Sequence, residues 1–277
     1  MATIVFETQL NEYQNRLSPK DNLSVLVGAN RFFFYISDAQ KRILYQKHFL
    51  LDEFKSYTEI RSIVESESIL KHGFQQINVG VDSEHFSLVP ALIYRPSVQK
   101  SYLEAICQPT KHEMIFTDAI EELDIKNVHT IDSRLYDELQ AVFPSFKLYH
   151  IATPFLRRTK RLINGDDVIV NVQPSELNII VYKNNQFQLY NNYKYNSAEA
   201  FLYYVLLMYQ QFDLDVNTAK LTLMGGIMPN SMIYKLLSTY IRQIQFAKRT
   251  KYYQFSPEYS SIPQQFHFDL YSLSVCE

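Results

Sequence analysis

Hydrophobic positions along the chain fall into two similar series, and each series starts with three short apolar runs. The runs are LSVLVGA, RFFFYISD and RILYQKHFLL in the first series, and DVIVNVQ, ELNIIVYKN and QFQLYNNYKY in the second. They are rich in β-branched and aromatic residues, which favour strands, and short segments with turn-forming residues such as PS and NN separate them. Each series therefore predicts a three-stranded antiparallel meander.

A helical pattern and a further strand follow each predicted meander. The helical stretches are FKSYTEIRSIVESESILK and SAEAFLYYVLLMYQQF, and Ser197 is the expected N-cap of the second. The runs QINVGVD and KLTLMG then predict a return to the sheet. This order, taken twice, predicts an α/β fold in which helices cover two mixed sheets.

The rest of each series alternates between helical and strand-like patterns. In the first series, residues 97–107 and SRLYDELQAVF predict helices, with Ser133 as the candidate cap, while MIFTDAI and NVHTID predict strands. In the second, NSMIYKLLSTYIRQI predicts a helix. Because no low-complexity linker separates the halves, we expect a helical or bent connection in residues 155–167 and two subdomains, 1–160 and 161–277.

The duplicated element order resembles the actin-like superfamily, which includes actin, Hsp70 chaperones, sugar kinases and the pilus assembly protein PilM. Within it, the chain is similar to a bacterial domain-of-unknown-function family with a degenerate actin-like, ribonuclease H-like fold. The stretches that carry this resemblance are EHFSLVPALIY, FPSFKLYH, NNQFQLYNNYKYNSAEAFLYYVL, LMGGI and FHFDLYSL. The resemblance covers nearly the whole chain and implies a duplicated actin-like fold.

The resemblance also implies where a nucleotide would bind. Functional members hold ATP between the halves with two phosphate loops, each of which normally carries an Asp that anchors Mg²⁺. The first loop aligns with LSVLVGAN, where Gly28 is kept but Leu26 takes the acidic position. The second aligns with VIVNVQPSEL, where Asn171 replaces the acid, Gln173 replaces a glycine, and Pro174 donates no N–H. Neither loop offers the carboxylate that anchors Mg²⁺, so we expect no efficient hydrolysis of ATP.

The adenosine loop of the superfamily is similar to LTLMGGIMPNS, in which Gly225 and Gly226 end a strand before a turn and a helix. Two adjacent glycines permit a close backbone approach, either to a nucleotide or to a neighbouring element. Two hypotheses follow. The chain is a non-catalytic actin-like scaffold that binds another protein and needs no cofactor, or it is a regulator that binds ATP or ADP without efficient hydrolysis.

Other chemistry has little support in the sequence. The seven histidines form no HExxH or HxH pair, Cys107 and Cys276 have no metal-binding or catalytic spacing, and no GxSxG or Walker motif occurs. We therefore assign no catalytic residue and no metal ligand. With Tyr and Phe numbering 21 and 19, the chain has aromatic side chains that could contribute to a protein-binding surface.

Charge and hydropathy restrict the partners. The formal net charge is −2, so only the local basic stretches FLRRTKRL and FAKRTKYYQF could attract nucleic acid, and we expect none to bind. The start has no basic segment followed by an apolar one, and no run approaches eighteen apolar residues. We expect a cytoplasmic protein without membrane insertion.

Overall fold

The computed structural model describes residues 3–9, 17–28, 30–51 and 56–276. The chain divides into two compact units. Unit 1 consists of residues 1–157, 251–261 and 272–277, and unit 2 consists of residues 158–250 and 262–271. The sequence gives no sign that residues 251–261 and 272–277 belong with the long N-terminal segment of unit 1.

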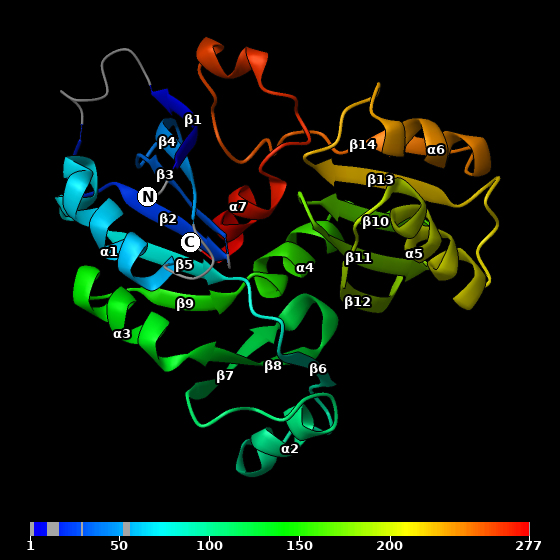
Figure 1. Ribbon diagram of the computed structural model, residues 1–277, viewed down its shortest axis with the longest axis horizontal. Coiled ribbons are helices and arrows are strands. Elements are labelled where there is room, and N and C mark those ends of the chain that lie inside the picture. Colours follow the sequence, from blue (N-terminus) through cyan, green and yellow to red (C-terminus); the bar gives the residue numbers. More distant parts are fainter. Residues whose placement is uncertain (1–2, 10–16, 29, 52–55, 277) are drawn as a thin grey trace. The chain divides into compact units, whose positions relative to one another are not determined.

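The main sheet of unit 1 has six strands in the order β1-β4-β3-β2-β5-β9 (Figure 1). They are β1 (Thr3–Gln9), β2 (Asn22–Gly28), β3 (Arg31–Ser37), β4 (Ile43–Leu50), β5 (Gln76–Val81) and β9 (Lys147–His150). The strands β2, β3 and β4 form the predicted antiparallel meander, and β5 returns parallel to β2. Strand β9 then pairs in parallel with β5. The carboxyl ends of β2, β5 and β9 therefore lie at one edge of the sheet.

Alternate residues of β2 face opposite sides of this sheet. Val25 and Val27 join the buried cluster under the helices α1 (Ser56–Ser66) and α3 (Ser133–Val142), which pack against each other. Leu26 is fully buried on the other side. Because both faces are covered, six of the seven positions of β2 are buried, which agrees with the apolar run from Val25 to Val27.

A small subdomain is inserted in unit 1 between β5 and α3. Its three strands are β6 (Phe86–Pro90), β7 (Glu113–Ile120) and β8 (Ile125–Asp132), in the antiparallel order β6-β8-β7. The short helices η3 (Pro96–Val98) and α2 (Gln99–Glu104) connect β6 to β7, and η4 (Glu121–Leu123) connects β7 to β8. Val89, Leu103 and Val128 form its own small core.

Unit 2 repeats the strand order of the main sheet from β4 to β9, and its described residues hold no counterpart of β1 and no insertion. Its strands are β10 (Asp167–Val172), β11 (Glu176–Lys183), β12 (Gln186–Lys194), β13 (Lys220–Gly225) and β14 (Ile244–Phe246), in the order β12-β11-β10-β13-β14. The first three form the second predicted meander, and β13 is parallel to β10. Asn184 and Asn185 have φ of 53° and 63°, so the NN pair forms the tight hairpin turn that it predicts.

Helices cover the sheet of unit 2 as expected. Phe201 and Val205 of α5 (Ala198–Gln211) pack in one buried cluster with strand residues such as Val170, and Leu237 of α6 (Met232–Tyr240) joins them. The predicted cap of α5 is confirmed, because the Ser197 hydroxyl accepts a hydrogen bond of 3.1 Å from the Ala200 amide.

The remaining helices are short: η2 (Ser68–Lys71), α4 (Ala152–Lys160), η5 (Pro257–Ser261), α7 (Phe268–Ser272) and η6 (Leu273–Cys276). The helical connection expected in residues 155–167 is α4, and the division between the units falls within it, after Arg157. No helix among the described residues is long and apolar enough to cross a membrane.

Several predicted boundaries were wrong. The cap of α3 is Asp132, not Ser133, because the Asp132 carboxylate accepts the hydrogen bond from the Arg134 amide. The helix predicted at 54–71 ends at Ser66 and continues as η2, and its first two positions lie outside the described residues. The helix predicted at 230–244 ends at Tyr240, and strand β14 follows. Strands β1, β6 and β9 were not predicted.

Candidate functional site

A cavity of about 380 Å³ lies in unit 1 at the carboxyl ends of β2 and β5. Ligands of α/β proteins often bind at this edge of a sheet, where the chain leaves parallel strands in different directions. The lining residues come from both strands, from α1 and α3, and from the inserted subdomain. They are Val27, Gly28, Ile60, Val81, Asp82, Ser83, Glu84, His85, Thr110, Glu113, Ile131, Asp132 and Leu135.

The lining separates into an apolar part and a polar part. Val27, Ile60, Val81 and Ile131 are buried side chains of the main core, and Leu135 of α3 joins them. Four carboxylates supply the charge, and no Lys or Arg is among the lining residues. The cavity can therefore contact the apolar part of a ligand and a positive group on the same ligand.

Asp82 follows directly after β5 and is held in place from two sides. Its amide donates a hydrogen bond of 2.9 Å to the carbonyl oxygen of Val27, and its Oδ2 accepts one of 3.1 Å from Arg31. Its side chain is only 10% exposed. No described residue donates a hydrogen bond to the other oxygen, Oδ1.

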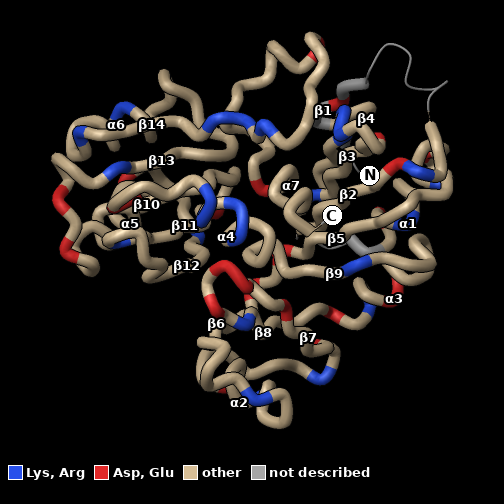
Figure 2. The backbone as a smooth tube through the Cα atoms, turned by 180° about the vertical axis from the view of Figure 1, so that it is seen from behind, with Lys and Arg blue, Asp and Glu red and all other residues tan. Residues whose placement is uncertain are grey.

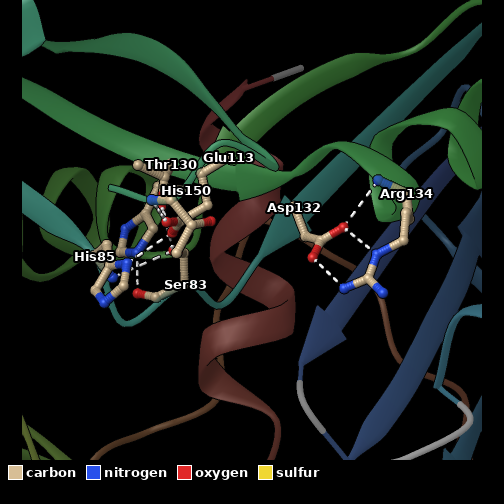
Figure 3. Close-up of polar contacts among 8 residues, drawn as sticks. Ser83, His85, Glu113, Thr130, Asp132, Arg134 and His150 are labelled. Atoms are coloured by element: carbon tan, nitrogen blue, oxygen red, sulfur yellow. Dashed lines mark hydrogen bonds and ion pairs between the residues drawn. The ribbon is translucent and has the colours of Figure 1, made fainter. Parts of the chain in front are cut away.

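Glu113, at the start of β7, is a lining carboxylate with hydrogen bonds at both of its oxygens (Figure 3). Its Oε1 lies 2.6 Å from Nδ1 of His85 and accepts a hydrogen bond of 2.7 Å from the Thr130 hydroxyl. Its Oε2 accepts one of 2.6 Å from the Thr110 amide. Burial opposes ionisation, but these hydrogen bonds outweigh it and lower the pKa of Glu113 to about 2. Glu113 therefore carries a negative charge at neutral pH.

Asp132 lies apart from this group in Figure 3 and bonds to Arg134 instead. As the cap of α3 it accepts a hydrogen bond of 2.8 Å from the Arg134 amide, and its Oδ2 lies 2.7 Å from the Arg134 guanidinium. The Arg134 side chain is 65% exposed, so water screens this ion pair strongly.

The buried side chain of His150 supports the loop that carries Asp82 and His85. Its Nε2 donates a hydrogen bond of 2.9 Å to the Ser83 carbonyl oxygen, while Nδ1 accepts one of 3.2 Å from the Ala152 amide. Burial, with the neighbouring His129 as a smaller cause, lowers the pKa of His150 to about 4. His150 is therefore neutral at pH 7 and holds the loop as a hydrogen-bond donor.

The predicted nucleotide positions of unit 1 have different surroundings. Gly28 lines the cavity, and a Cβ at this position would lie 2.9 Å from Cγ of Arg31. Leu26 points to the face of the sheet opposite Val25 and Val27, where a Cβ on Gly80 would meet Leu26, Ile151 and Leu273 within 3.5 Å. Leu26 is thus packed among apolar side chains, and η6 supplies one of them.

The corresponding positions of unit 2 form a chain of amides. Nδ2 of Asn171 and Nε2 of Gln173 both donate to Oδ1 of Asn178, each over 3.1 Å. Asn178 in turn donates from Nδ2 to Oδ1 of Asn192 over 2.8 Å. Asn171 is 1% exposed, and its Nδ2 is used within the sheet, whereas its buried Oδ1 accepts no hydrogen bond from the described residues.

The glycine pair lies against the same chain of amides. Gly225 has φ of 77°, and a Cβ there would lie 2.8 Å from both the Val172 nitrogen and Oδ1 of Asn171. The amide of Gly226 donates a hydrogen bond of 2.8 Å to the Val172 carbonyl oxygen, and that of Gly225 donates one of 2.9 Å to Gln265. The close backbone approach that the glycines permit is therefore to the protein's own chain.

The structure brings Asn171, Gln173, Gly225 and Gly226 together in unit 2, whereas Gly28 and Leu26 belong to unit 1. Sequence reasoning missed Asp82, His85 and Glu113. The position of Asp82, directly after the buried strand QINVGV, was an available signal. Glu113 had none, because the insertion brings it to the cavity from far along the chain.

Most cations of the two basic stretches are engaged with the protein's own acceptors. Arg157 forms an ion pair of 3.0 Å with Glu122, Arg158 donates to the Thr250 hydroxyl, and Lys160 donates to the Asn185 carbonyl oxygen. Arg249 donates to the Ile262 carbonyl oxygen. Figure 2 shows the basic positions of the first stretch in blue at α4. These contacts leave fewer cations to bind a phosphate backbone.

Among the described residues, no group of three or more His, Cys, Asp and Glu side chains is arranged to hold a metal ion.

A comparison with known protein families identifies the family of this chain. The model of DUF3822, a protein family of unknown function, matches residues 11–244. The chain belongs to this family. No curated protein matches it.

Solved structures show the fold of this DUF3822 chain. A Bacteroides thetaiotaomicron protein with an actin-like ATPase fold and unknown function superposes with a TM-score of 0.80 and 17% identity, over 97% of this chain and 100% of that one. A chain of the PilM-PilN type IV pilus biogenesis complex superposes with a TM-score of 0.60 and 9% identity, over 92% and 98%. The DUF3822 chain therefore has an actin-like fold, as its resemblance implied.

Proposed function

We propose that this DUF3822 protein is a non-catalytic actin-like scaffold that binds a partner protein and requires no nucleotide. The observation that carries the proposal is the state of the two positions where the superfamily places its metal-anchoring acids. Leu26 is fully buried among apolar side chains, and Asn171 donates to Asn178 within the sheet. Neither position offers a charged oxygen to Mg²⁺ or to an attacking water.

The glycine pair supports the same conclusion. A nucleotide-binding loop must leave backbone amides free for the ligand, but the amides of Gly225 and Gly226 already donate to Gln265 and Val172. The strand, turn and helix of an adenosine loop are present, yet the donors are used within unit 2. This favours a retained tight turn over a ligand site.

A protein partner is favoured by the surface of the inserted subdomain. Its segment 91–106 exposes four large apolar side chains, and Leu92 is 96% exposed. The others are Ile93, Val98 and Ile106. Exposed apolar side chains concentrated in one segment are typical of protein-binding surfaces. The PilM-PilN complex, an assembly of two proteins, includes a chain with the same fold, which agrees with this proposal.

Isothermal titration with ATP and ADP, each with and without Mg²⁺, tests the proposal. We expect no saturable heat with any of the four ligands at concentrations up to about 1 mM, which corresponds to a binding free energy weaker than about −4 kcal/mol. Phosphate release from ATP should equal that of a buffer blank.

The alternative is a regulator that binds ATP or ADP and changes conformation without efficient hydrolysis. Saturable binding with micromolar affinity would establish that alternative and refute the scaffold proposal. In that case Gly225→Ala should abolish the heat, while Ser197→Ala, at the cap of α5 and outside the predicted nucleotide positions, serves as the control.

We further propose that the protein acts in the cytoplasm, without membrane insertion and without nucleic acid. Binding to a fluorescent single-stranded oligonucleotide tests the last point. We expect the anisotropy of the oligonucleotide to stay unchanged at every salt concentration. Binding of its phosphates by basic side chains would instead raise the anisotropy at low salt, and this rise would disappear as salt increases.

A further inference from the structure

The cavity at the ends of β2 and β5 combines two features that define its ligand. Its volume of about 380 Å³ is within the range of pockets that hold organic ligands. Its lining contains five aliphatic side chains and four carboxylates, without Lys or Arg. An inorganic cation would leave the apolar part uncovered. Arg31 and Arg134 pair with two of the four carboxylates, and the negative charge of Glu113 still disfavours an anion. A cationic group on an apolar stem satisfies both parts.

Asp82 supplies the unused acceptor of this cavity. Its side chain is nine-tenths buried, and Arg31 bonds to only one of its two oxygens. No described residue donates to its Oδ1, so an incoming N–H can bond there. Glu113 lines the same cavity and stays ionised, because its hydrogen bonds hold its pKa near 2. The site is therefore prepared for a positive donor.

We propose that this cavity binds the side chain of an arginine that a partner protein presents on an exposed segment. The guanidinium donates to Oδ1 of Asp82 and lies in the field of Glu113 and Glu84, while its methylene stem contacts Val81, Ile131 and Leu135. This inference rests on the proposed function, because it names the chemistry by which the scaffold recognises its partner.

Arginine fits better than lysine for a geometric reason. The guanidinium is planar and carries five N–H donors, so it can bond to carboxylates that lie on different walls of a cavity. It is also more weakly hydrated than an ammonium group, so moving it onto an apolar floor costs less. A neutral analogue of the same shape keeps the apolar contacts but lacks the charge.

The test is a titration of the full chain, labelled with ¹⁵N, with short peptides followed by backbone amide shifts. The probes are Ac-Leu-Arg-Leu-NH₂, the same peptide with lysine, and the same peptide with citrulline, the neutral isostere of arginine. We expect the arginine peptide to shift the amides of Gly28, Asp82 and Glu113 with a Kd below about 10 mM, the lysine peptide to bind several-fold more weakly, and the citrulline peptide at least tenfold more weakly.

The variant Asp82→Asn tests whether the arginine peptide binds in this cavity or at another acidic site. It keeps the shape of the side chain but removes the charge, and we expect it to weaken the arginine peptide about tenfold, because hydrogen bonds to a charged group contribute about 1.5–3 kcal/mol. The matched control is Glu104→Gln on α2, a side chain 48% exposed that does not line the cavity. It makes the same change of net charge, and we expect unchanged affinity.

Three results would overturn the inference: no binding of the arginine peptide, equal binding of the citrulline peptide, or unchanged affinity in Asp82→Asn with an otherwise native amide spectrum. Agmatine, which has the guanidinium and stem without a peptide backbone, is the fourth probe. Affinity for agmatine equal to that of the peptide would overturn the assignment to a protein segment. Failure here leaves the scaffold proposal standing, because that proposal fails only if the nucleotide titration is positive.

Discussion

The two units of this protein share one order of strands, but different residues surround the end of the first meander strand in each. In unit 1, β2 ends at Gly28 beside a cavity with a charged rim. In unit 2, β10 ends at Val172, and the carbonyl oxygen of Val172 accepts a hydrogen bond from the amide of Gly226. Two copies of one topology thus differ in what their first turn contacts.

The difference lies in the elements that follow the sheet. The inserted subdomain of unit 1 adds a second wall, which carries Glu113, opposite the turn after β2. Unit 2 has no such insertion, and its turn packs against the end of β13. The same scaffold therefore supports a binding cavity in one unit and a closed turn in the other, which fits the rule that function depends on sites added to a fold.

The largest expected effect comes from restoring acids at the two degenerate positions. Leu26→Asp places an unpaired carboxylate in an apolar environment and should destabilise the protein by about 4 kcal/mol or more. Asn171→Asp replaces a donor by an acceptor facing Asn178 and should cost about 2 kcal/mol. Urea denaturation followed by circular dichroism measures both, with Leu26→Met as the volume-conserving control, which should cost under about 1.5 kcal/mol. A Leu26→Asp variant of native stability would contradict the buried position of Leu26.

The glycines give the next largest contrast between the units. Gly225→Ala adds a Cβ against the Val172 backbone at a positive φ, and should destabilise the protein by about 3 kcal/mol. Gly28→Ala meets only the flexible Arg31 side chain and should cost under about 1 kcal/mol. The midpoints of urea unfolding decide between these values. Equal losses of unfolding free energy in the two variants would show that Gly225 does not lie against the Val172 backbone.

Acidification should have opposite effects in the two units. Burial lowers the pKa of His150 from 6.5 to about 4, so the folded state resists protonation and unit 1 loses stability as the pH falls from 6.5 towards 4. Burial raises the pKa of Asp167 in unit 2 from 3.8 to about 6, although Thr222 donates a hydrogen bond to it. Its contribution is present below pH 3.8 and is lost as the pH rises through 6.

The variant Asp167→Asn separates these two contributions. Between pH 6.5 and 5, His150 should remove about 2 kcal/mol and Asp167 should restore about 1 kcal/mol. The variant lacks the opposing contribution, so its urea midpoint should fall more steeply over this range than that of the parent chain. Parallel pH profiles of the two proteins would rule out the titration of Asp167.

The smallest expected effect concerns the helix caps. Ser197→Ala removes the cap of α5 in unit 2 and should cost about 1 kcal/mol in the free energy of unfolding. Ser133→Ala in unit 1 should cost less than about 0.5 kcal/mol, because Asp132 is the cap there. The reverse order in urea unfolding would restore Ser133 as the cap.

Local patterns were sufficient to predict much of the fold. Alternation and β-branched residues predicted both meanders, the NN pair predicted the turn at Asn184 and Asn185, and Ser197 was correctly placed as a cap. At α3 two adjacent residues could both act as caps, and only the backbone conformation decides for Asp132. Short strands such as β9 depend on pairing with β5, which no local pattern records.

The candidate site was less predictable, because its residues are distant in the sequence. The alignment with the phosphate loops pointed to Gly28 and Leu26, which are two residues apart on β2, but only Gly28 lines the cavity. Asp82 and Glu113 line one cavity because the inserted subdomain contributes to the wall at the end of β5. Such a site follows from topology and not from the composition of any single stretch.

Hydrogen exchange at the two turns tests the central claim most directly. Amide deuteration of residues 28–31 and 225–227 is measured by mass spectrometry with MgATP, with MgADP and without nucleotide. The scaffold account predicts identical exchange in all three samples, because the amides of Gly225 and Gly226 already have partners within unit 2. Protection of either turn by a nucleotide, at a concentration that leaves the rest of the chain unchanged, would contradict it.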